Sequence, residues 1–287
     1  MLKSLKKFNY FLLKRKKIFL IENEKDKIFL ENSLIDEDYI AIDTEFNWRK
    51  TYFPELSLIQ LSTSTKIFLI DFLKLKEISF LRKILESRKK KIIMHSARND
   101  STVLSTNLNI NLKKSFDVQI AEKYINGGTV KNYAFIVSKY FGHKLSKSET
   151  NSNWLKRPLT QKQLEYAADD VNFLIPIFKK QLKILKKLKK DKIVYSESQK
   201  ETLLGNEDLK ESRVKKLGKI SKNAKKIFIW REELAQSNNV PTSYIFKNNF
   251  LKKLCKFLDG NSHRSNIKYF FEDHAYYEKF LKDFCTK

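Results

Sequence analysis

The chain has 287 residues, of which 41% are hydrophobic; this fits a globular protein with a sizeable core and excludes a disordered chain. Lysine and arginine number 58 against 33 aspartate and glutamate, which gives a formal net charge of +25. An excess of this size favours a polyanionic partner, and nucleic acid fits it better than a membrane surface does.

Cysteine usage and hydropathy point to a cytoplasmic protein. The two cysteines, Cys255 and Cys285, lie near the end of the sequence and form no metal-ligand cluster, which fits a reducing compartment. No apolar run reaches the length of a membrane span. Lys14 to Lys17 interrupts the apolar residues of the basic N-terminus, so we expect mature sequence there rather than a signal peptide.

The first half of the chain alternates strand and helix patterns. We expect a short strand at 18–21 followed by a polar connection, and a buried strand at 39–46. Two apolar runs separated by three polar residues predict a hairpin. The expected elements from there are the hairpin strands 57–62 and 66–71, a helix over 74–88, a strand at 91–95 and a helix over 97–106.

The middle of the chain is helical with one long loop. Residues 115–141 have a helical pattern with a break at Gly127 and Gly128, and a polar loop covers 142–158. Long loops are uncommon unless they bind or cover something. Thr160 and Gln163 form a capping-box signature for the next helix, which Pro176 should kink or end. We expect the lysine-rich run over 179–190 to form the solvated face of a helix. The alternative is that its lysines contact backbone phosphates.

A change of composition divides the chain into two domains. Residues 191–214 are polar and charged, and the pattern is helical after them. The sequence therefore predicts a main domain over 1–192, a linker over 193–214 and a small helical domain over 215–287, in whose core Cys255 is expected.

Three stretches carry acids in positions that can support chemistry. Asp43 and Glu45 alternate at a strand end and so point the same way. Asp100 lies where a strand passes into a helix, and Tyr166 shares a helical face with Asp170. Four carboxylates from separate elements could hold two divalent ions, and a tyrosine hydroxyl could orient or deprotonate an attacking water.

Simpler interpretations remain for these side chains. Each acid alone could be a surface charge, and this is the interpretation we prefer for Asp169. His95 lies close to the expected site, where packing or support of a neighbour suits it better than metal ligation. The sequence has no G-x-x-x-x-G-K motif and no dinucleotide fingerprint, so no nucleotide cofactor is expected.

Three stretches within residues 39–178 are specific enough to compare with known families. They are IAIDTEF with the following RKTYFPELSLIQLS, then MHSARNDSTVL, and then SKSETNSNWLKRPLTQKQLEYAADDVNFL. In these stretches the chain resembles the ribonuclease D family of the DEDD exonuclease superfamily. The resemblance implies a ribonuclease H-like fold, a mixed sheet flanked by helices. It implies that Asp43, Glu45, Asp100 and Asp170 bind metal and that Tyr166 is the water-positioning residue of the tyrosine subtype, since Glu165 stands where the histidine subtype has its histidine.

The C-terminal part resembles an HRDC domain. The resemblance rests on the stretch WREELAQSNNVPTSYIFKNNFLKKLCKF. Members of the family often carry two such domains, and this chain has room for one.

The resemblance implies a two-metal 3′→5′ exoribonuclease that releases 5′-mononucleotides from RNA. Mg²⁺ or Mn²⁺ would be the ions and transfer-RNA precursors the substrate. Apart from the resemblance, we expect a monomer with no membrane partner. Two alternatives stay open: a DNA 3′ exonuclease of the same superfamily, which the catalytic acids do not distinguish, and a catalytically dead nucleic-acid-binding protein. The presence of all five motif residues argues against the latter.

Overall fold

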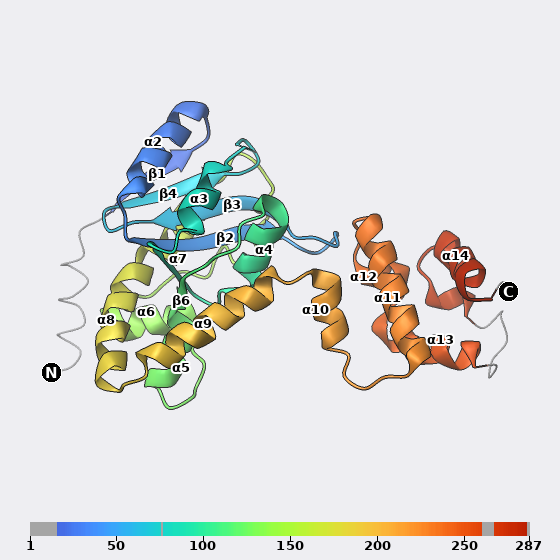
Figure 1. Cartoon of the computed structure of the whole chain (residues 1–287). Helices are drawn as coiled ribbons and strands as arrows, with labels where there is room; N and C mark the ends of the chain where they lie inside the picture. The colour runs from blue at the N-terminus through green and yellow to red at the C-terminus, as the bar shows by residue number, and fades with distance from the viewer. Residues whose placement is uncertain (1–15, 76, 260–266, 286–287) are drawn as a thin grey trace. The chain divides into compact units, whose positions relative to one another are not determined.

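The computed structural model describes residues 16–75, 77–259 and 267–285, which form two compact units. The first unit contains the described residues up to Asn47 together with Glu55–Asn206. The second contains Trp48–Pro54 and the described residues from Glu207 onward. Each unit is described by itself below, with the element labels of Figure 1.

A six-stranded mixed sheet forms the centre of the first unit (Figure 1). Its strand order is β1-β4-β3-β2-β5-β6, in which β3 runs antiparallel to β2 and β4, and the other neighbours are parallel. The strands are β1 (Lys17–Ile21), β2 (Tyr39–Asn47), β3 (Glu55–Ser62), β4 (Lys66–Asp71), β5 (Lys91–Met94) and β6 (Ser115–Asp117).

Helices cover both faces of this sheet. Successive strand residues point to opposite faces, and the residues on each face are apolar. On β2, Ile40 and Ile42 belong to one core cluster and Ala41 to the other. The first cluster takes side chains from α2 (Glu24–Ile35), α3 (Phe80–Leu85) and α4 (Arg98–Leu108). The second takes them from α5 (Val118–Ile125), α6 (Tyr133–Phe141), α7 (Gln161–Asn172), α8 (Leu174–Lys187) and α9 (Asp191–Asn206). The predicted mixed sheet flanked by helices is confirmed.

Several element boundaries differ from the sequence-based prediction. Helix α2 lies where the sequence predicts a polar connection, because its exposed Phe29 and Ile35 blur the pattern of its buried positions. Leu75 and Ile78 are buried as expected, but they precede α3, which is shorter than the predicted helix over 74–88. Strand β6 has only three residues and lay inside a predicted helical segment. A burial pattern alone does not separate a packed loop or a short strand from a helix.

The break between α7 and α8 lies at Phe173 and not at Pro176. Pro176 is the third residue of α8. In the first turn of a helix no intrahelical partner exists for the amide hydrogen that proline lacks, so proline fits there.

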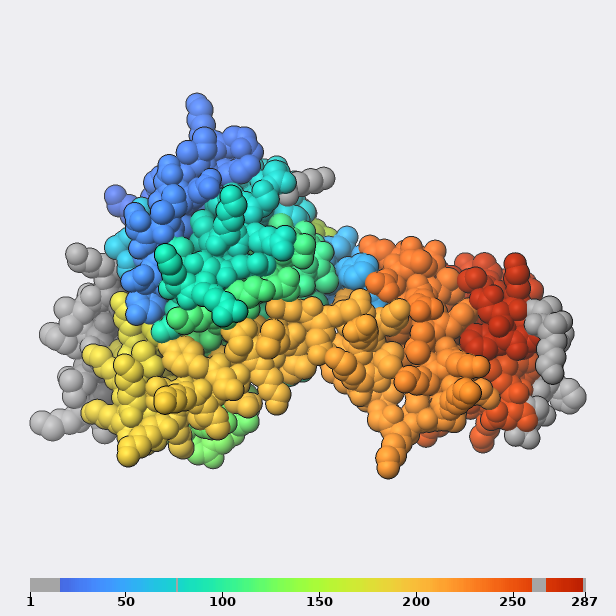
Figure 2. Space-filling view, viewed as in Figure 1, coloured from blue at the N-terminus to red at the C-terminus, as the bar shows by residue number. Residues whose placement is uncertain are grey.

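The segment predicted as a linker over 193–214 is largely helical. Helix α9 covers most of it and packs on α4. Arg98 donates two hydrogen bonds to the Glu201 carboxylate, and Thr102 donates to the carbonyl of Gly205. The polar composition that suggested a linker serves a polar interface between two helices. Figure 2 shows α8 and α9 as a continuous surface on the first unit.

Gly205 allows this close approach and provides a test of it. A Cβ at this position would lie 2.3 Å from the Arg98 carbonyl oxygen and 2.7 Å from the Ser101 Cβ. We expect Gly205→Ala to lower the free energy of unfolding by about 1–3 kcal/mol, because the obstructing atoms belong to a packed helix. Urea denaturation measures this. Exposed Lys200→Ala on the same helix is the control and should change stability by less than about 0.5 kcal/mol. Equal stabilities of wild type and Gly205→Ala would show that α9 is not held against α4.

The second unit consists of helices and of the loop Trp48–Pro54, which comes from the N-terminal half of the chain. Its core cluster contains Cys255, as predicted, together with apolar residues of several short helices. These helices are α10 (Leu209–Lys215), α11 (Lys222–Ser237), α12 (Thr242–Ile245), α13 (Leu251–Leu258) and α14 (His274–Cys285), with 3₁₀ turns at Asn248–Phe250 and Lys268–Phe270.

The segment Trp48–Pro54 packs into this second unit through Tyr52. The Tyr52 side chain is 1% exposed, and its hydroxyl donates to Glu232 at 3.1 Å. Arg213 donates to the same carboxylate oxygen and places its guanidinium over the Tyr52 ring. The buried Glu232 carboxylate is thus paired, which offsets the cost of its burial. Sequence patterns gave no sign that this loop belongs with the C-terminal helices.

None of the helices in the described ranges combines the length and the apolar character that crossing a bilayer requires.

Candidate active site

Strand β2 supplies the first two acids. Asp43 and Glu45 lie opposite Gln60 and Leu58 of β3, two residues apart on one face of the sheet. A register irregularity follows immediately, between Glu45 and Phe46. Because Ala41 of the same face packs in the cluster that includes α7, the two carboxylates point toward that helix.

Helix α4 brings Asp100 to the intervening residue of β2. The side chain of Asp100 is 7% exposed, and its Oδ1 accepts hydrogen bonds from the backbone amide (3.1 Å) and the hydroxyl (2.6 Å) of Thr44. Helix α4 starts just after β5, which runs parallel to β2, so its first turn lies beside the same strand end. These bonds fix Asp100 between the positions of Asp43 and Glu45 along the strand.

Helix α7 supplies Tyr166 and Asp170, one turn apart. The predicted capping box is present: Thr160 accepts from the Gln163 amide, and the Gln163 side chain accepts from the Thr160 amide. These reciprocal bonds set where the helix begins and hence which of its residues face β2. The structure thus brings Asp43, Glu45, Asp100, Tyr166 and Asp170 together beside β2, an inner strand of the sheet.

The long loop over 142–158 approaches α7 and is fixed at its base by Arg157. The Arg157 guanidinium donates to both carboxylate oxygens of Asp71, at 2.6 and 2.9 Å, and also to the Trp154 carbonyl. A bidentate pair of this kind is geometrically specific. Further along the loop, the Thr150 hydroxyl lies 3.4 Å from the Tyr166 hydroxyl. The loop, whose length suggested that it binds or covers something, thus lies beside Tyr166.

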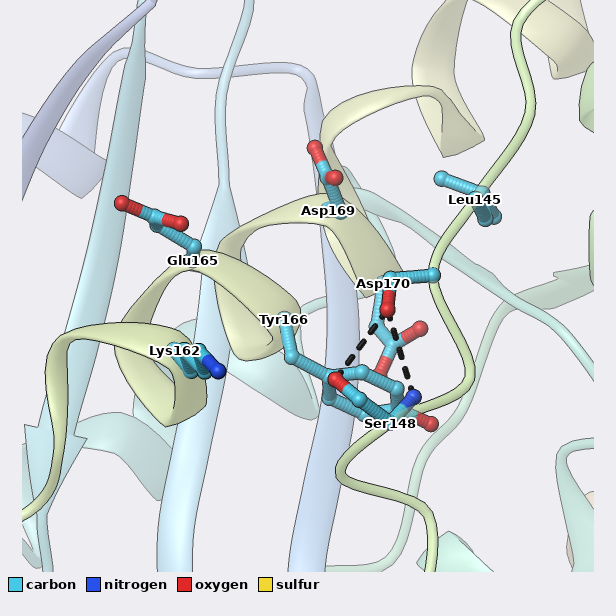
Figure 3. A pocket seen from close by; sticks show the side chains of 8 residues that line it. Leu145, Ser148, Lys162, Glu165, Tyr166, Asp169 and Asp170 are labelled. Carbon is cyan, nitrogen blue, oxygen red and sulfur yellow. Dashed lines mark hydrogen bonds between the residues drawn. The ribbon is translucent and has the colours of Figure 1, made fainter.

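Two cavities adjoin Tyr166 and Asp170. One, of about 220 Å³, is lined by Asp43, Glu45, His95, Tyr133, Tyr166, Asp170 and Leu174. The other, of about 380 Å³, lies between α7 and the 142–158 loop (Figure 3) and is lined by Leu145, Ser146, Ser148, Lys162, Glu165, Tyr166, Asp169 and Asp170. We call them the carboxylate cavity and the loop cavity.

Burial raises the pKa of all four acids, and repulsion by neighbouring carboxylates adds to the rise. Burial is the larger cause throughout. The pKa of Glu45 rises to about 9, with Asp170 and Asp100 adding repulsion. The pKa of Asp170 rises to about 7, that of Asp100 only to about 6 because the Thr44 bonds favour its ionised form, and that of Asp43 well above its ordinary value. Without cations, several of these groups therefore hold protons at neutral pH.

Burial and the nearby carboxylates also keep the site tyrosines neutral. Burial first and the Asp170 charge second raise the pKa of Tyr166 to about 12. The same two causes raise the pKa of Tyr133, whose hydroxyl donates to the Asp169 carbonyl. Tyr166 is thus a phenol that can donate and accept a hydrogen bond, and this favours orienting a water over deprotonating it.

His95 packs and supports a neighbouring segment. Its ring centroid is 5.4 Å from that of Tyr133, and its Nε2 lies 3.3 Å from the Gln119 amide nitrogen. That nitrogen also donates to the Lys131 carbonyl, so the imidazole Nε2 accepts and the proton of the neutral ring is on Nδ1. Burial lowers the pKa of His95.

The donor set suits a hard divalent cation. Four carboxylates with raised pKa values are oxygen ligands of the kind that Mg²⁺ and Mn²⁺ prefer, and a cation would relieve their repulsion. Within residues 16–75, 77–259 and 267–285, however, no three His, Cys, Asp or Glu side chains are already gathered as a metal-binding cluster. The acids fit the ions in chemistry and location, and binding requires their side chains to converge further.

Sequence patterns missed part of the cavity lining. Tyr133 follows a glycine break and carries no motif, and Ser146, Ser148 and Lys162 resemble ordinary polar surface residues. The length of the 142–158 loop was the available signal. Asp169, expected to be a surface charge, is half-buried and lines the loop cavity, where Figure 3 shows it directed away from Asp170.

Comparison with known families places this fold. A family model described as 3′-5′ exonuclease matches residues 19–186, and an HRDC domain model matches residues 222–263. The chain therefore belongs to the 3′-5′ exonuclease family, and it carries an HRDC domain.

Within this family the chain is similar to ribonuclease D. It is 30% identical to Ribonuclease D of Desulfotalea psychrophila over 248 residues, which are 82% of this chain and 66% of that protein. It is 38% identical to Ribonuclease D of Escherichia coli over 138 residues, 48% of this chain and 37% of that protein. The aligned part thus spans two thirds or less of the length of these relatives.

A solved structure shares the fold. The crystal structure of Escherichia coli RNase D, an exoribonuclease involved in structured RNA processing, superposes with a TM-score of 0.82 at 23% identity, covering 93% of this chain and 73% of that one. The likeness supports the described architecture.

The raised pKa values predict how stability depends on pH in the absence of metal. The pKa of Glu45 is about 9 in the folded protein against an ordinary 4.5, so between these values the folded state binds more protons than the unfolded state. Stability must therefore fall as the pH rises from about 4 to 9. Thermal denaturation in EDTA should show this slope. Glu45→Gln should make it shallower, whereas Glu31→Gln, at an exposed acid outside the site, should not. A metal-free stability that rises over this range would contradict the assigned shifts.

Proposed function

We propose that the protein is a metal-dependent 3′→5′ exoribonuclease that releases 5′-mononucleotides. The observation that carries this proposal is the cavity that Asp43, Glu45, Tyr166 and Asp170 line together, with Asp100 bonded to Thr44 beside it. Membership of the 3′-5′ exonuclease family and the similarity to ribonuclease D support it.

The four carboxylates would hold two divalent cations, Mg²⁺ or Mn²⁺. A related fold, that of Brucella melitensis NrnC, has been solved with bound Mg²⁺, at 22% identity and a TM-score of 0.57, covering 71% of this chain and 95% of that one. When bound, a pair of such ions stabilises the charge that develops on the attacking and leaving oxygens of a displacement at phosphorus.

The remaining work falls to the side chains of the chain itself. Tyr166, held as a neutral phenol, would orient the attacking water from the side of α7. Thr150 lies within hydrogen-bond reach of the Tyr166 hydroxyl and would fix its direction. Asp100, tied to Thr44, would keep its carboxylate in place while the partly exposed Asp43 and Glu45 move. Positioning and electrostatics would thus supply the catalysis without a covalent intermediate.

RNA is the proposed substrate, and the 3′ ends of transfer-RNA precursors are the proposed physiological class. The net charge of +25 favours a phosphate-rich partner. We further propose that the protein acts in the cytoplasm as a monomer. DNA is the second candidate, since the same acids would act on either polymer.

Matched oligonucleotides test the activity and its direction. We propose 5′-labelled RNA and DNA of one sequence, incubated with Mg²⁺, with Mn²⁺ or with EDTA. The expected result is a ladder that shortens from the 3′ end of the RNA and requires the cation. Shortening of the DNA alone would make the protein a DNA exonuclease, and intact substrates in every cation would favour a binding protein without catalysis.

Asp43→Asn should abolish cleavage while leaving RNA binding. The substitution keeps the size of the side chain but removes a charge that the cations require, so we expect a fall in kcat of at least about 100-fold, the order that one electrostatic group supplies. Single-turnover rates measure this, with binding followed in Ca²⁺. Asp36→Asn, at an exposed acid outside the site, is the matched control and should keep the wild-type rate within about threefold, since it removes only a surface charge. Full activity of Asp43→Asn would remove the metal assignment.

Tyr166→Phe should lower kcat by about 10- to 100-fold with little change in the dissociation constant for RNA. The ring remains in place, and only the hydroxyl that orients the water is lost. Tyr140→Phe, which loses a hydroxyl bonded to Glu122, is the control and should retain the wild-type rate. If both variants cleave as fast as wild type, Tyr166 has no part in the reaction.

A further inference from the structure

The two cavities at Tyr166 and Asp170 differ in the chemistry of their linings. The carboxylate cavity adds His95, Tyr133 and Leu174 to the acids, which gives it aromatic and apolar walls. The loop cavity adds serine hydroxyls and a lysine. Since Tyr166 and Asp170 line both, a chain bound across them can place its scissile phosphate at the shared wall, with one nucleotide on either side.

Lys162 is the one lysine or arginine among the residues that line either cavity in the described part of the chain. The same two linings contain five carboxylates, and Asp100, which lines neither cavity, is not among them. A polyanionic substrate that enters such surroundings is repelled at every position where no cation compensates it. Divalent ions would compensate at the scissile phosphate, and Lys162 would do so in the loop cavity.

The local structure gives no other account of Lys162. It lies in the first turn of α7, where a positive charge opposes the helix dipole. The neighbouring Glu165 accepts instead from Gln161 at 3.0 Å, and no salt bridge of Lys162 occurs with the residues that the structure describes. Figure 3 shows the Lys162 amino group directed toward the Tyr166 side of the cavity and the Glu165 carboxylate directed away from it.

The spacing along α7 matches successive phosphates. Lys162 and Tyr166 are four residues apart, about 6 Å along the helix axis, on one face. This separation is comparable with that of neighbouring phosphates in a single strand. Ser146 and Ser148, hydrogen-bonded to each other at 3.1 Å, face the same space from the loop.

We propose that the loop cavity is a subsite for the penultimate nucleotide of the substrate, in which Lys162 binds the phosphate immediately 5′ of the scissile one. The 3′-terminal nucleoside then occupies the carboxylate cavity against His95, Tyr133 and Leu174. This inference rests on the proposed exonuclease function and deepens it by giving the substrate a direction across the two cavities. Lys162 acts on substrate binding and not on the chemical step.

Neutralising single phosphates in the substrate tests this assignment. Three RNA oligonucleotides of one sequence would be compared. All three carry 2′-O-methyl sugars at the second and fifth linkages from the 3′ end, so they differ only in the charge of these linkages. The first has only phosphodiesters, the second a methylphosphonate at the second linkage, and the third a methylphosphonate at the fifth. The rate of the first cleavage, as kcat/KM, is measured for wild type, Lys162→Ala and Lys147→Ala. Lys147 is an exposed lysine of the same loop that does not line the cavity.

The expected result is an interaction between one lysine and one phosphate. Neutralising the second linkage should lower kcat/KM of wild type and of Lys147→Ala by roughly three- to fivefold, the effect of one partly exposed ion pair. It should leave Lys162→Ala unchanged, because that variant has already lost the contact. Neutralising the fifth linkage should affect all three proteins alike.

Two other outcomes are distinguishable. Equal effects of the second linkage in wild type and Lys162→Ala would overturn the subsite, even though all proteins cleave RNA. Absence of cleavage of the all-phosphodiester RNA by wild type would overturn the exonuclease proposal itself, and with it the subsite.

Discussion

Four carboxylates near one another beside the inner strand β2 impose the central constraint on this protein. Burial raises the pKa of each of them, and repulsion among them raises the pKa of Asp43, Glu45 and Asp170 further. The fold must therefore supply enough apolar packing to hold them together without a basic partner at the same spot. It does so by placing them on three elements, β2, α4 and α7, that are fixed by large cores on both faces of the sheet. The stability of those cores permits an arrangement that is unfavourable by itself.

The constraint also explains why polar contacts surround the acids. The Thr44 bonds to Asp100 favour its ionised form and limit the rise of its pKa. The Thr160 and Gln163 capping box and the Arg157–Asp71 pair fix α7 and the base of the neighbouring loop. None of these groups meets a substrate in the proposed function. They determine where the reacting groups lie, and small displacements of such groups are costly in catalysis.

Local chemistry decided how much the sequence could predict. Alternation on the 39–46 strand placed Asp43 and Glu45 on one face, and the capping box located the start of α7; both are properties of neighbouring residues. Helix α9 was missed because its polar residues, such as Glu201, bond to a distant helix that periodicity does not reveal. The packing of Tyr52 with Glu232 was missed for the same reason, since 180 residues separate them. The sequence does not predict that Lys162 lines a cavity, because that cavity exists only after the loop has folded over the helix.

The acidic site and the strongly basic chain are complementary under the proposed function. Without cations, the acids reduce their repulsion by holding protons, and a polyanion gains nothing from approaching them. Divalent cations held by these carboxylates in place of the protons would make the site attractive to phosphate, and a bound phosphate would in turn stabilise the cations. Because such coupling is reciprocal, each ligand must raise the affinity for the other by the same factor. Basic residues elsewhere would hold the chain of RNA by charge alone, whereas the carboxylates would select the position at which it is cut.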